Sequence, residues 1–137
     1  MGAQMALFTW DHKYSVNNDE LDNHHKKLFA IFNKLYDSCL DKGNCITSGP
    51  IVEELVSYTN YHFVAEEKYM QSIGYKDINK HISLHRIFTD SICQQLHKED
   101  TNDIVVTKQL VLFIWNWLLN HVMIEDKKYS IKLNRKF

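Results

Sequence analysis

Residues 50–74 read PIVEELVSYTNYHFVAEEKYMQSIG, and this stretch decides the fold. Its apolar residues recur at alternating three- and four-residue spacings, which is the pattern of an amphipathic α-helix. Pro50 is a favourable first helical residue and Gly74 is a favourable C-terminal cap, so this helix has a defined start and end. His62 and Glu66 lie on the apolar stripe. A four-residue step turns an α-helix by only about 40°, so both side chains point the same way.

Three other segments show the same amphipathic pattern. We predict helices from about Asp19 to Leu40, from near Asp77, and from near 102–103, with Asn18 and Asp19 offering an N-terminal cap to the first. The connections, at about 41–49, 74–77 and 97–102, are short enough to favour antiparallel neighbours. The sequence therefore predicts an all-α fold, an up-down-up-down antiparallel four-helix bundle.

The chain of 137 residues is long enough for one domain with its own core. We expect a single domain over 1–137, in which 1–18 form an extended N-terminal arm, about 19–128 form the bundle, and 129–137 form a short C-terminal tail. The arm holds Phe8, Trp10, Tyr14 and Val16, which are suited to packing over the helices.

The composition is that of an ordinary soluble globular protein, with 45% apolar and 24% charged residues. Sixteen basic against 17 acidic residues give a net charge of −1, so nothing indicates a nucleic-acid or membrane partner. The first ten residues lack the pattern of a signal peptide, and no apolar run approaches the roughly 20 residues of a membrane span. We expect a cytoplasmic monomer.

The three cysteines have no metal-binding or disulfide framework. Their odd number favours reduced thiols, with Cys39 and Cys93 as small core residues and Cys45 in a loop, although a Cys39–Cys45 bridge is compatible with the spacing. Glu67 lies off the apolar stripe of its helix, and we expect it at the surface.

Seven side chains that can bind metal fall on the apolar stripes of the four helices or close beside them. They are five histidines and two carboxylates: His25, His62, Glu66, His81, His85, His121 and Asp126. A four-helix bundle points all four stripes inward, so these groups converge on its axis. Burying so many polar groups without a metal would be costly. Imidazole and carboxylate ligands together suit iron, zinc, copper or manganese, and this number of ligands suits two ions.

The ligand count also predicts an asymmetric pair of metal ions. Two carboxylates can bridge the ions, and five histidines then divide as three and two. With one further solvent-derived bridge, one ion has a full set of ligands and the other has an open position for a small molecule. Asp126 is the difficult ligand, because a five-residue step from His121 turns a regular helix by about 140°. Either a side chain that reaches across or a local distortion of the helix is needed.

Several motifs, in order along nearly the whole chain, resemble hemerythrin, especially the bacterial single-domain form. They are Trp10 with Tyr14-Ser15-Val16; Asp22-x-x-His25-Lys26-x-Leu28-Phe29; His62-Phe63-x-x-Glu66-Glu67; His81-x-x-x-His85; and Trp117-Leu118-x-x-His121-x-x-x-x-Asp126-Lys127-x-Tyr129. One departure is His24, which stands where bacterial members usually have Gln. Helical phase favours His25 over His24 as the ligand, because residue 25 lies on the stripe with residues 21, 28 and 32.

The resemblance implies reversible dioxygen binding, for storage, delivery or sensing, at two non-haem iron ions with a bridging oxo or hydroxo group and no haem. It assigns His81, His85 and His121 to one iron, and His25 and His62 to the other, where dioxygen would bind. Glu66 and Asp126 would bridge, and Phe63, Trp117 and Leu119 would line the oxygen pocket.

Two alternatives to oxygen binding remain open from the sequence. Di-iron proteins that oxidise substrates use mostly carboxylate ligands, whereas this set is mostly neutral, so we expect an oxygen-binding protein rather than an enzyme. The first alternative is nevertheless a di-iron enzyme that reduces peroxide or nitric oxide or oxidises ferrous iron. The second is a regulatory module that holds zinc or a single iron.

Overall fold

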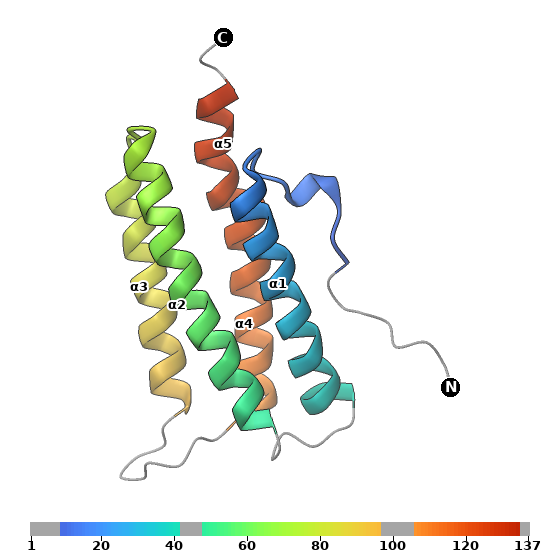
Figure 1. Cartoon of the computed structure of the whole chain (residues 1–137). Coiled ribbons are helices and arrows are strands. Elements are labelled where there is room, and N and C mark those ends of the chain that lie inside the picture. Colours follow the sequence, from blue (N-terminus) through green and yellow to red (C-terminus); the bar gives the residue numbers. More distant parts are fainter. Residues whose placement is uncertain (1–8, 42–47, 97–105, 135–137) are drawn as a thin grey trace.

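The computed structural model describes residues 9–41, 48–96 and 106–134. Its four main helices are α1 (Asp19–Tyr36), α2 (Gly49–Ser72), α3 (Ile78–Leu96) and α4 (Lys108–Asn120). Successive helices run in opposite directions (Figure 1), and each packs against the next, with α4 also against α1. The described ranges contain no strand. The predicted all-α, up-down-up-down bundle is confirmed.

The ends of the first two helices follow the predicted caps. The Asn18 side chain accepts a hydrogen bond from the Leu21 N–H at 3.0 Å, which caps α1. Beyond the end of α2, Gly74 adopts a left-handed conformation with φ of 65°. The Tyr75 N–H then reaches the Met70 carbonyl at 2.9 Å, which is the Schellman arrangement that a glycine at this position permits.

The fourth helix begins later than predicted. Val106 and Thr107 are not helical, so a start near 102–103 is wrong, and α4 begins at Lys108. The reason is Thr107. Its hydroxyl accepts a hydrogen bond from the Leu110 N–H at 3.1 Å and acts as the N-cap.

The C-terminal part of the bundle is longer than predicted. A π-helical turn, η4 (His121–Glu125), continues α4 into α5 (Asp126–Asn134), as Figure 1 shows. Residues 129–134, expected as part of a tail, are therefore helical. Tyr129 explains the difference, because it is fully buried and anchors α5 to the bundle. A second π-helical segment, η2 (Asp37–Asp41), extends α1 over the predicted length.

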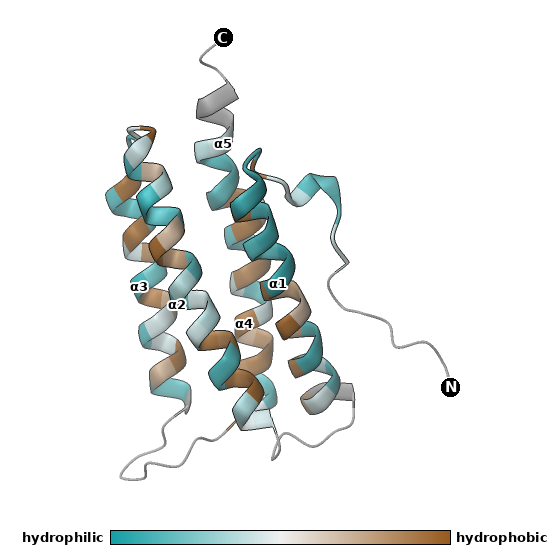
Figure 2. Ribbon diagram, viewed as in Figure 1, coloured by the Kyte–Doolittle hydropathy of each residue, from teal (hydrophilic) through white to brown (hydrophobic). Residues whose placement is uncertain are grey.

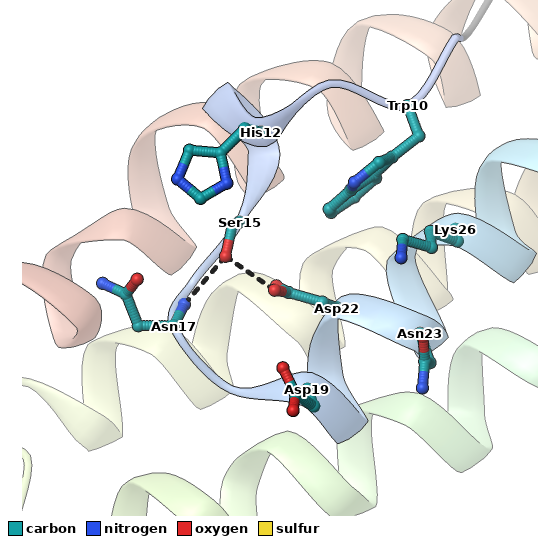
Figure 3. A pocket seen from close by; sticks show the side chains of 8 residues that line it. All are labelled: Trp10, His12, Ser15, Asn17, Asp19, Asp22, Asn23 and Lys26. Carbon is teal, nitrogen blue, oxygen red and sulfur yellow. Dashed lines mark hydrogen bonds between the residues drawn. The ribbon is translucent and has the colours of Figure 1, made fainter.

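The described part of the N-terminal arm packs on α1, as predicted. It contains the 3-10 turn η1 (His12–Tyr14), and the Tyr14 ring lies 5.1 Å from that of Phe29. The Asp22 carboxylate accepts hydrogen bonds from the Ser15 hydroxyl at 2.6 Å and the Val16 N–H at 2.8 Å. Figure 3 shows Ser15 between Asp22 and the backbone of Asn17, in a polar pocket that these contacts help to form. Phe8 lies outside the described residues.

The core consists of two apolar clusters, which occupy opposite ends of the bundle. The larger includes Phe32, Leu55 and Leu118, and the smaller includes Leu21 and Tyr129. In the view of Figure 2, apolar residues of α1, α2 and α4 gather toward the end where α1 finishes and α2 begins. On α1 and α3 the predicted metal ligands lie between residues of the two clusters, whereas Phe63 on α2 and Val122 on η4 belong to the larger cluster and stand among the ligands. The polar site is therefore closed off by apolar packing on both sides.

The cysteine predictions are partly wrong. Cys39 is fully buried, as predicted, but it is disulfide-bonded, so the expectation of reduced thiols fails there. Cys93, expected in the core, is exposed, because on α3 it follows the buried Ile92 and a single step turns it about 100° away. Cys45 lies outside the described residues.

None of the helices in the described ranges has both the length and the apolar content that crossing a membrane requires.

Candidate metal centre

The seven predicted ligands come from four helical columns and meet in one place. His25 lies on α1, His62 and Glu66 on α2, His81 and His85 on α3, and His121 and Asp126 at the two ends of η4. Each is at most 4% exposed. They form two groups that share Glu66, and within each group one ligand atom per residue lies within 4.8 Å of all the others. One group is Glu66, His81, His85 and His121; the other is His25, His62, Glu66 and Asp126.

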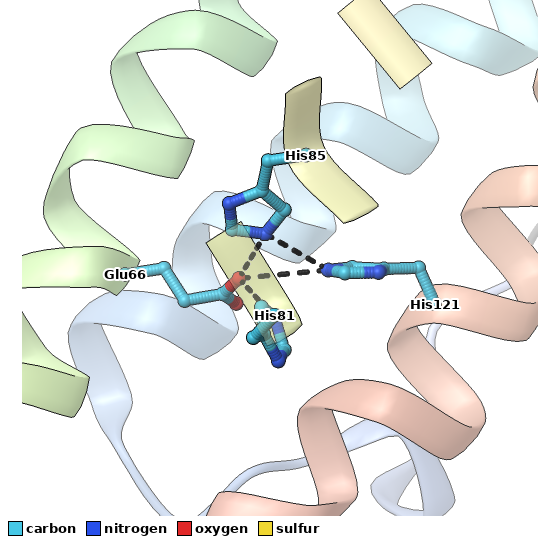
Figure 4. A group of neighbouring side chains, drawn as sticks. All are labelled: Glu66, His81, His85 and His121. Atoms are coloured by element: carbon cyan, nitrogen blue, oxygen red, sulfur yellow. Dashed lines mark hydrogen bonds and ion pairs between the residues drawn. The ribbon is translucent and has the colours of Figure 1, made fainter. Parts of the chain in front are cut away.

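Glu66 faces both groups, one oxygen to each. Its Oε1 lies 3.0 Å from His81 Nε2, 2.8 Å from His85 Nε2 and 3.6 Å from His121 Nε2, the arrangement drawn in Figure 4. Its Oε2 lies 3.3 Å from His62 Nε2 and 3.7 Å from His25 Nε2. A carboxylate held in this way has the geometry to bridge two cations.

Asp126 repeats this arrangement from the opposite side of the bundle. Its Oδ1 lies 2.9 Å from His121 Nε2 and 3.0 Å from His81 Nε2, whereas its Oδ2 lies 3.1 Å from His25 Nε2. The two carboxylates therefore span the same pair of histidine groups, with three histidines on one side and two on the other.

The π-helical turn explains how Asp126 reaches the site. In η4 the Asp126 N–H donates to the carbonyl of His121, five residues earlier. A turn closed by such a bond brings residues five apart to nearly the same face, which a regular α-helix does not. Of the two possibilities that the sequence left open, the local distortion is confirmed. Such turns are frequent at functional sites.

Three further residues contact the ligands from outside the group. Glu67 is 31% exposed, so it lies partly at the surface as expected, but its Oε2 also lies 2.9 Å from His85 Nδ1, a contact that was not predicted. The Tyr129 hydroxyl donates to Glu66 Oε2 at 3.0 Å. His24 lies behind His62, with 3.0 Å between their Nδ1 atoms. The choice of His25 over His24 as the inward residue is confirmed.

Sequence reasoning missed the roles of Glu67 and Tyr129 for different reasons. Tyr129 stands three residues after Asp126 and therefore lies on the same helical face. This spacing would predict a contact with the site only if the helix were known to continue past Asp126. Glu67 lies on a half-exposed face of α2 and reaches His85 on the neighbouring α3. Only the packing of the two helices reveals that contact.

The charges of the cluster balance one another in the metal-free protein. Burial disfavours imidazolium, but the carboxylates of Asp126 and Glu66 close to both rings outweigh it and raise the pKa of His25 to about 9 and of His81 to about 10. Burial likewise favours neutral carboxyl groups, but the neighbouring histidines hold the pKa values of Glu66 and Asp126 below their ordinary values. Protons on imidazole thus offset the two buried negative charges.

The surroundings of the Asp126 carboxylate indicate whether these residues suit a metal. Both of its carboxylate oxygens are buried, and within the described parts of the chain neither receives a well-directed hydrogen bond. Such groups are costly to bury unless a cation satisfies them. Five imidazoles with two bridging carboxylates are ligands that iron accepts. The residues therefore fit a pair of non-haem iron ions.

Two of the three predicted pocket residues form an aromatic wall. The Phe63 ring stacks on His85, with 3.7 Å between centroids, and also lies 6.1 Å from the His62 ring. The Trp117 ring stacks on His121 at 4.2 Å. This wall therefore lies chiefly against the three-histidine group.

The third predicted pocket residue, Leu119, does not fit this arrangement. It is only half-buried, whereas Leu118 is 1% exposed. Leu118 is three residues before His121 and shares its face, whereas a two-residue step points Leu119 away. Phase and burial favour Leu118.

Comparison with known proteins gives consistent matches over most of the chain. The family described as "Hemerythrin HHE cation binding domain" matches residues 16–132. Bacteriohemerythrin of Clostridium acetobutylicum is 32% identical over 129 residues, which cover 90% of this chain and 98% of the relative. Bacteriohemerythrin of Methylococcus capsulatus is 33% identical over 128 residues, with 92% and 96% covered. A crystal structure of wild-type hemerythrin has a TM-score of 0.78 at 32% identity, covering 91% of this chain and 96% of that one.

Proposed function

Because this chain belongs to the hemerythrin family, we propose that it binds dioxygen reversibly at a non-haem di-iron centre. The observation that carries the proposal is the pair of buried carboxylates. Glu66 and Asp126 each direct one oxygen to His81 and the other to His25, so both carboxylates would be able to bridge a pair of cations. A site for one metal ion has no need of two such bridges.

The ligand assignment follows the two observed groups. His81, His85 and His121 would hold one iron, and His25 and His62 would hold the other. Glu66 and Asp126 would bridge the two, together with an oxo or hydroxo group. The ferrous pair, when bound, supplies the electrons for reversible binding of dioxygen. Two histidines against three leave the open position on the iron of His25 and His62.

The surrounding residues protect the centre from water. The Phe63 and Trp117 rings cover the imidazoles of His85 and His121, and Leu118 closes the core below them. We propose Leu118, in place of Leu119, as the aliphatic residue of the pocket. Apolar walls of this kind admit a small uncharged gas and exclude water and larger polar molecules.

The test of this function is iron content together with a visible spectrum cycled between air and argon. We expect two irons per chain and a spectrum that forms in air, disappears under argon and returns over several cycles. An enzyme would instead consume an electron donor or substrate irreversibly. One iron per chain, or mainly zinc, would contradict the di-iron proposal and favour the regulatory module.

A further inference from the structure

Among the described residues, His24 is the one histidine that touches the metal ligands without belonging to either group. It lies on α1 next to His25 and is 6% exposed. Its Nδ1 is 3.0 Å from Nδ1 of His62, on the side of that ring opposite to the Nε2 atom that faces Glu66. A second imidazole thus stands directly behind the imidazole assigned to the oxygen-binding iron.

Chemistry fixes the direction of this hydrogen bond when metal is bound. His62 binds through the lone pair of Nε2, so the neutral ring carries its proton on Nδ1 and must donate. His24 Nδ1 must therefore accept, which requires His24 to be neutral with its own proton on Nε2. The two tautomers determine each other.

His25, the other histidine of the same group, has no comparable hydrogen bond to its Nδ1 atom among the described residues. The Nδ1 atom itself is buried. On the other side of the centre, His85 is supported by the carboxylate of Glu67. Within the described parts of the chain, the contact with His24 is thus the one hydrogen bond to the Nδ1 atom of a ligand histidine on the side where dioxygen is proposed to bind.

Given the proposed di-iron function, we propose that His24 is a positioning residue for the oxygen-binding iron. The Nδ1 atom of His24 accepts the hydrogen bond that His62 donates from its own Nδ1. This contact fixes the orientation of the His62 ring and makes its Nε2 a stronger metal ligand. A neutral imidazole polarises His62 less than the Glu67 carboxylate polarises His85, so the two irons receive ligands of different strength.

The position of His24 is itself held by aromatic packing. Its ring meets Tyr58 edge to face at a centroid distance of 5.9 Å and lies 5.3 Å from the ring of Tyr61. The Lys27 ammonium lies 5.1 Å from the Tyr58 ring centroid. A substitution that keeps a flat ring at position 24 can therefore preserve the packing while removing the acceptor.

Two substitutions separate the hydrogen bond from the packing. His24→Phe keeps a ring but has no acceptor, and His24→Gln restores an acceptor through its amide oxygen. Tyr61→Phe, which alters the neighbouring ring without touching His62, is the matched control. Loss of a supporting hydrogen bond to a metal-bound histidine typically weakens metal affinity by about 10- to 100-fold.

The first measurement is the loss of iron to a chelator in the wild type and the three variants. We expect His24→Phe to release one of its two irons at about 10- to 100-fold lower chelator concentration. The second iron should be retained as in the wild type, and His24→Gln and Tyr61→Phe should behave nearly as the wild type. Release of both irons together, release as in the wild type, or no rescue by Gln would overturn the role of His24.

The second measurement needs no variant, so it decides the matter even if His24→Phe fails to fold. In the zinc-loaded wild-type chain, which is diamagnetic, nitrogen NMR should find His24 with Nδ1 unprotonated and His62 with Nδ1 protonated. A proton on His24 Nδ1 would overturn the proposal. A wild type that holds only one iron would overturn the di-iron function instead, so the two failures are distinguishable.

Discussion

At the scale of single residues, the carboxylates of Glu66 and Asp126 connect the two groups of histidines, and they differ in the hydrogen-bond donors available to them. Glu66 is fully buried and receives a hydrogen bond from Tyr129, whereas both oxygens of Asp126 lack such a donor among the described residues. Asp126 therefore depends more completely on bound cations, and it is the better residue with which to test the bridges.

Replacing Asp126 by Asn should abolish binding of the iron pair while leaving the bundle folded. The amide keeps the size of the side chain but removes the charge and one of the two oxygens that face the histidine groups. Iron content should fall from two to at most one per chain, with a nearly unchanged helical circular dichroism spectrum. Two tightly bound irons in this variant would show that Asp126 does not bridge.

Replacing Glu67 by Gln should weaken the three-histidine iron selectively. The carboxylate contacts His85 Nδ1 at 2.9 Å, and losing its charge weakens that ligand. We expect an affinity loss of up to about 100-fold for one iron. Glu53→Gln, on an exposed part of the same helix, is the control. An effect equal to that of the control would argue against the contact.

Leu118 and Leu119 provide a matched pair for the pocket. Leu118→Ala opens a cavity in the core and should speed the oxidative decay of the oxygenated form by admitting water, at a cost of about 2–5 kcal/mol in stability. Leu119→Ala should change both quantities much less, because its side chain is half-exposed. Decay followed by visible absorbance compares them, and a larger effect at Leu119 would support the original sequence assignment.

At the scale of helices, the number, order and approximate bounds of the bundle helices could be predicted, because the apolar stripe and the capping residues of a helix are visible in the sequence. Asn18, Pro50 and Gly74 acted as expected. The ambiguities arose where one residue type serves two roles. Thr107 is compatible with an apolar stripe and with an N-cap. The five-residue step from His121 to Asp126 indicates that either the helix is distorted or a side chain reaches across. A π-helical turn has no sequence signature of its own, so the sequence could not decide between the two.

The Schellman cap of α2 gives an element-scale prediction. A Cβ at Gly74 would meet nothing within 4 Å, so the cost of Gly74→Ala comes from the left-handed backbone alone. We expect a loss of about 1–2 kcal/mol in unfolding free energy with iron content unchanged, measured by urea denaturation. Gly74→Asn should lose less, because Asn tolerates this conformation. An equal loss in the two variants would point to a different cause.

At the scale of the whole molecule, the buried charges predict how stability varies with pH in the metal-free protein. The pKa values of His25 and His81 are raised from 6.5 to about 9 and about 10. Their contribution is therefore fully present below about pH 6.5 and is lost as the pH rises through about 9 to 10. The pKa values of Glu66 and Asp126 are lowered, so their contribution is present above about pH 4.5 and is lost on acidification below that.

Chemical denaturation of chelator-treated protein between pH 6 and 10 measures this effect. The unfolding free energy should decline from about pH 6.5 up to about pH 9 to 10. The decline should be smaller in iron-loaded protein, because metal already replaces the protons on the imidazoles. A stability that rises over this range in the metal-free protein would contradict the charge balance described for the site.

The convergence of the seven ligands was predictable from the sequence, because the apolar stripes of all four helices must face the one interior of a bundle. The supporting contacts were not, because they depend on which exposed flank of one helix meets the next. Glu67 with His85 and His24 with His62 both cross between helices in this way. These contacts distinguish the two proposed iron sites, whose ligand sets otherwise differ only by one histidine.

The most direct test of the centre is dioxygen uptake per iron by ferrous-loaded protein. A pair of irons bridged by Glu66 and Asp126, with one open position on the iron of His25 and His62, predicts one dioxygen for every two irons, released in full under argon. Uptake of one dioxygen per iron, or uptake that argon does not reverse, would contradict a reversible di-iron centre.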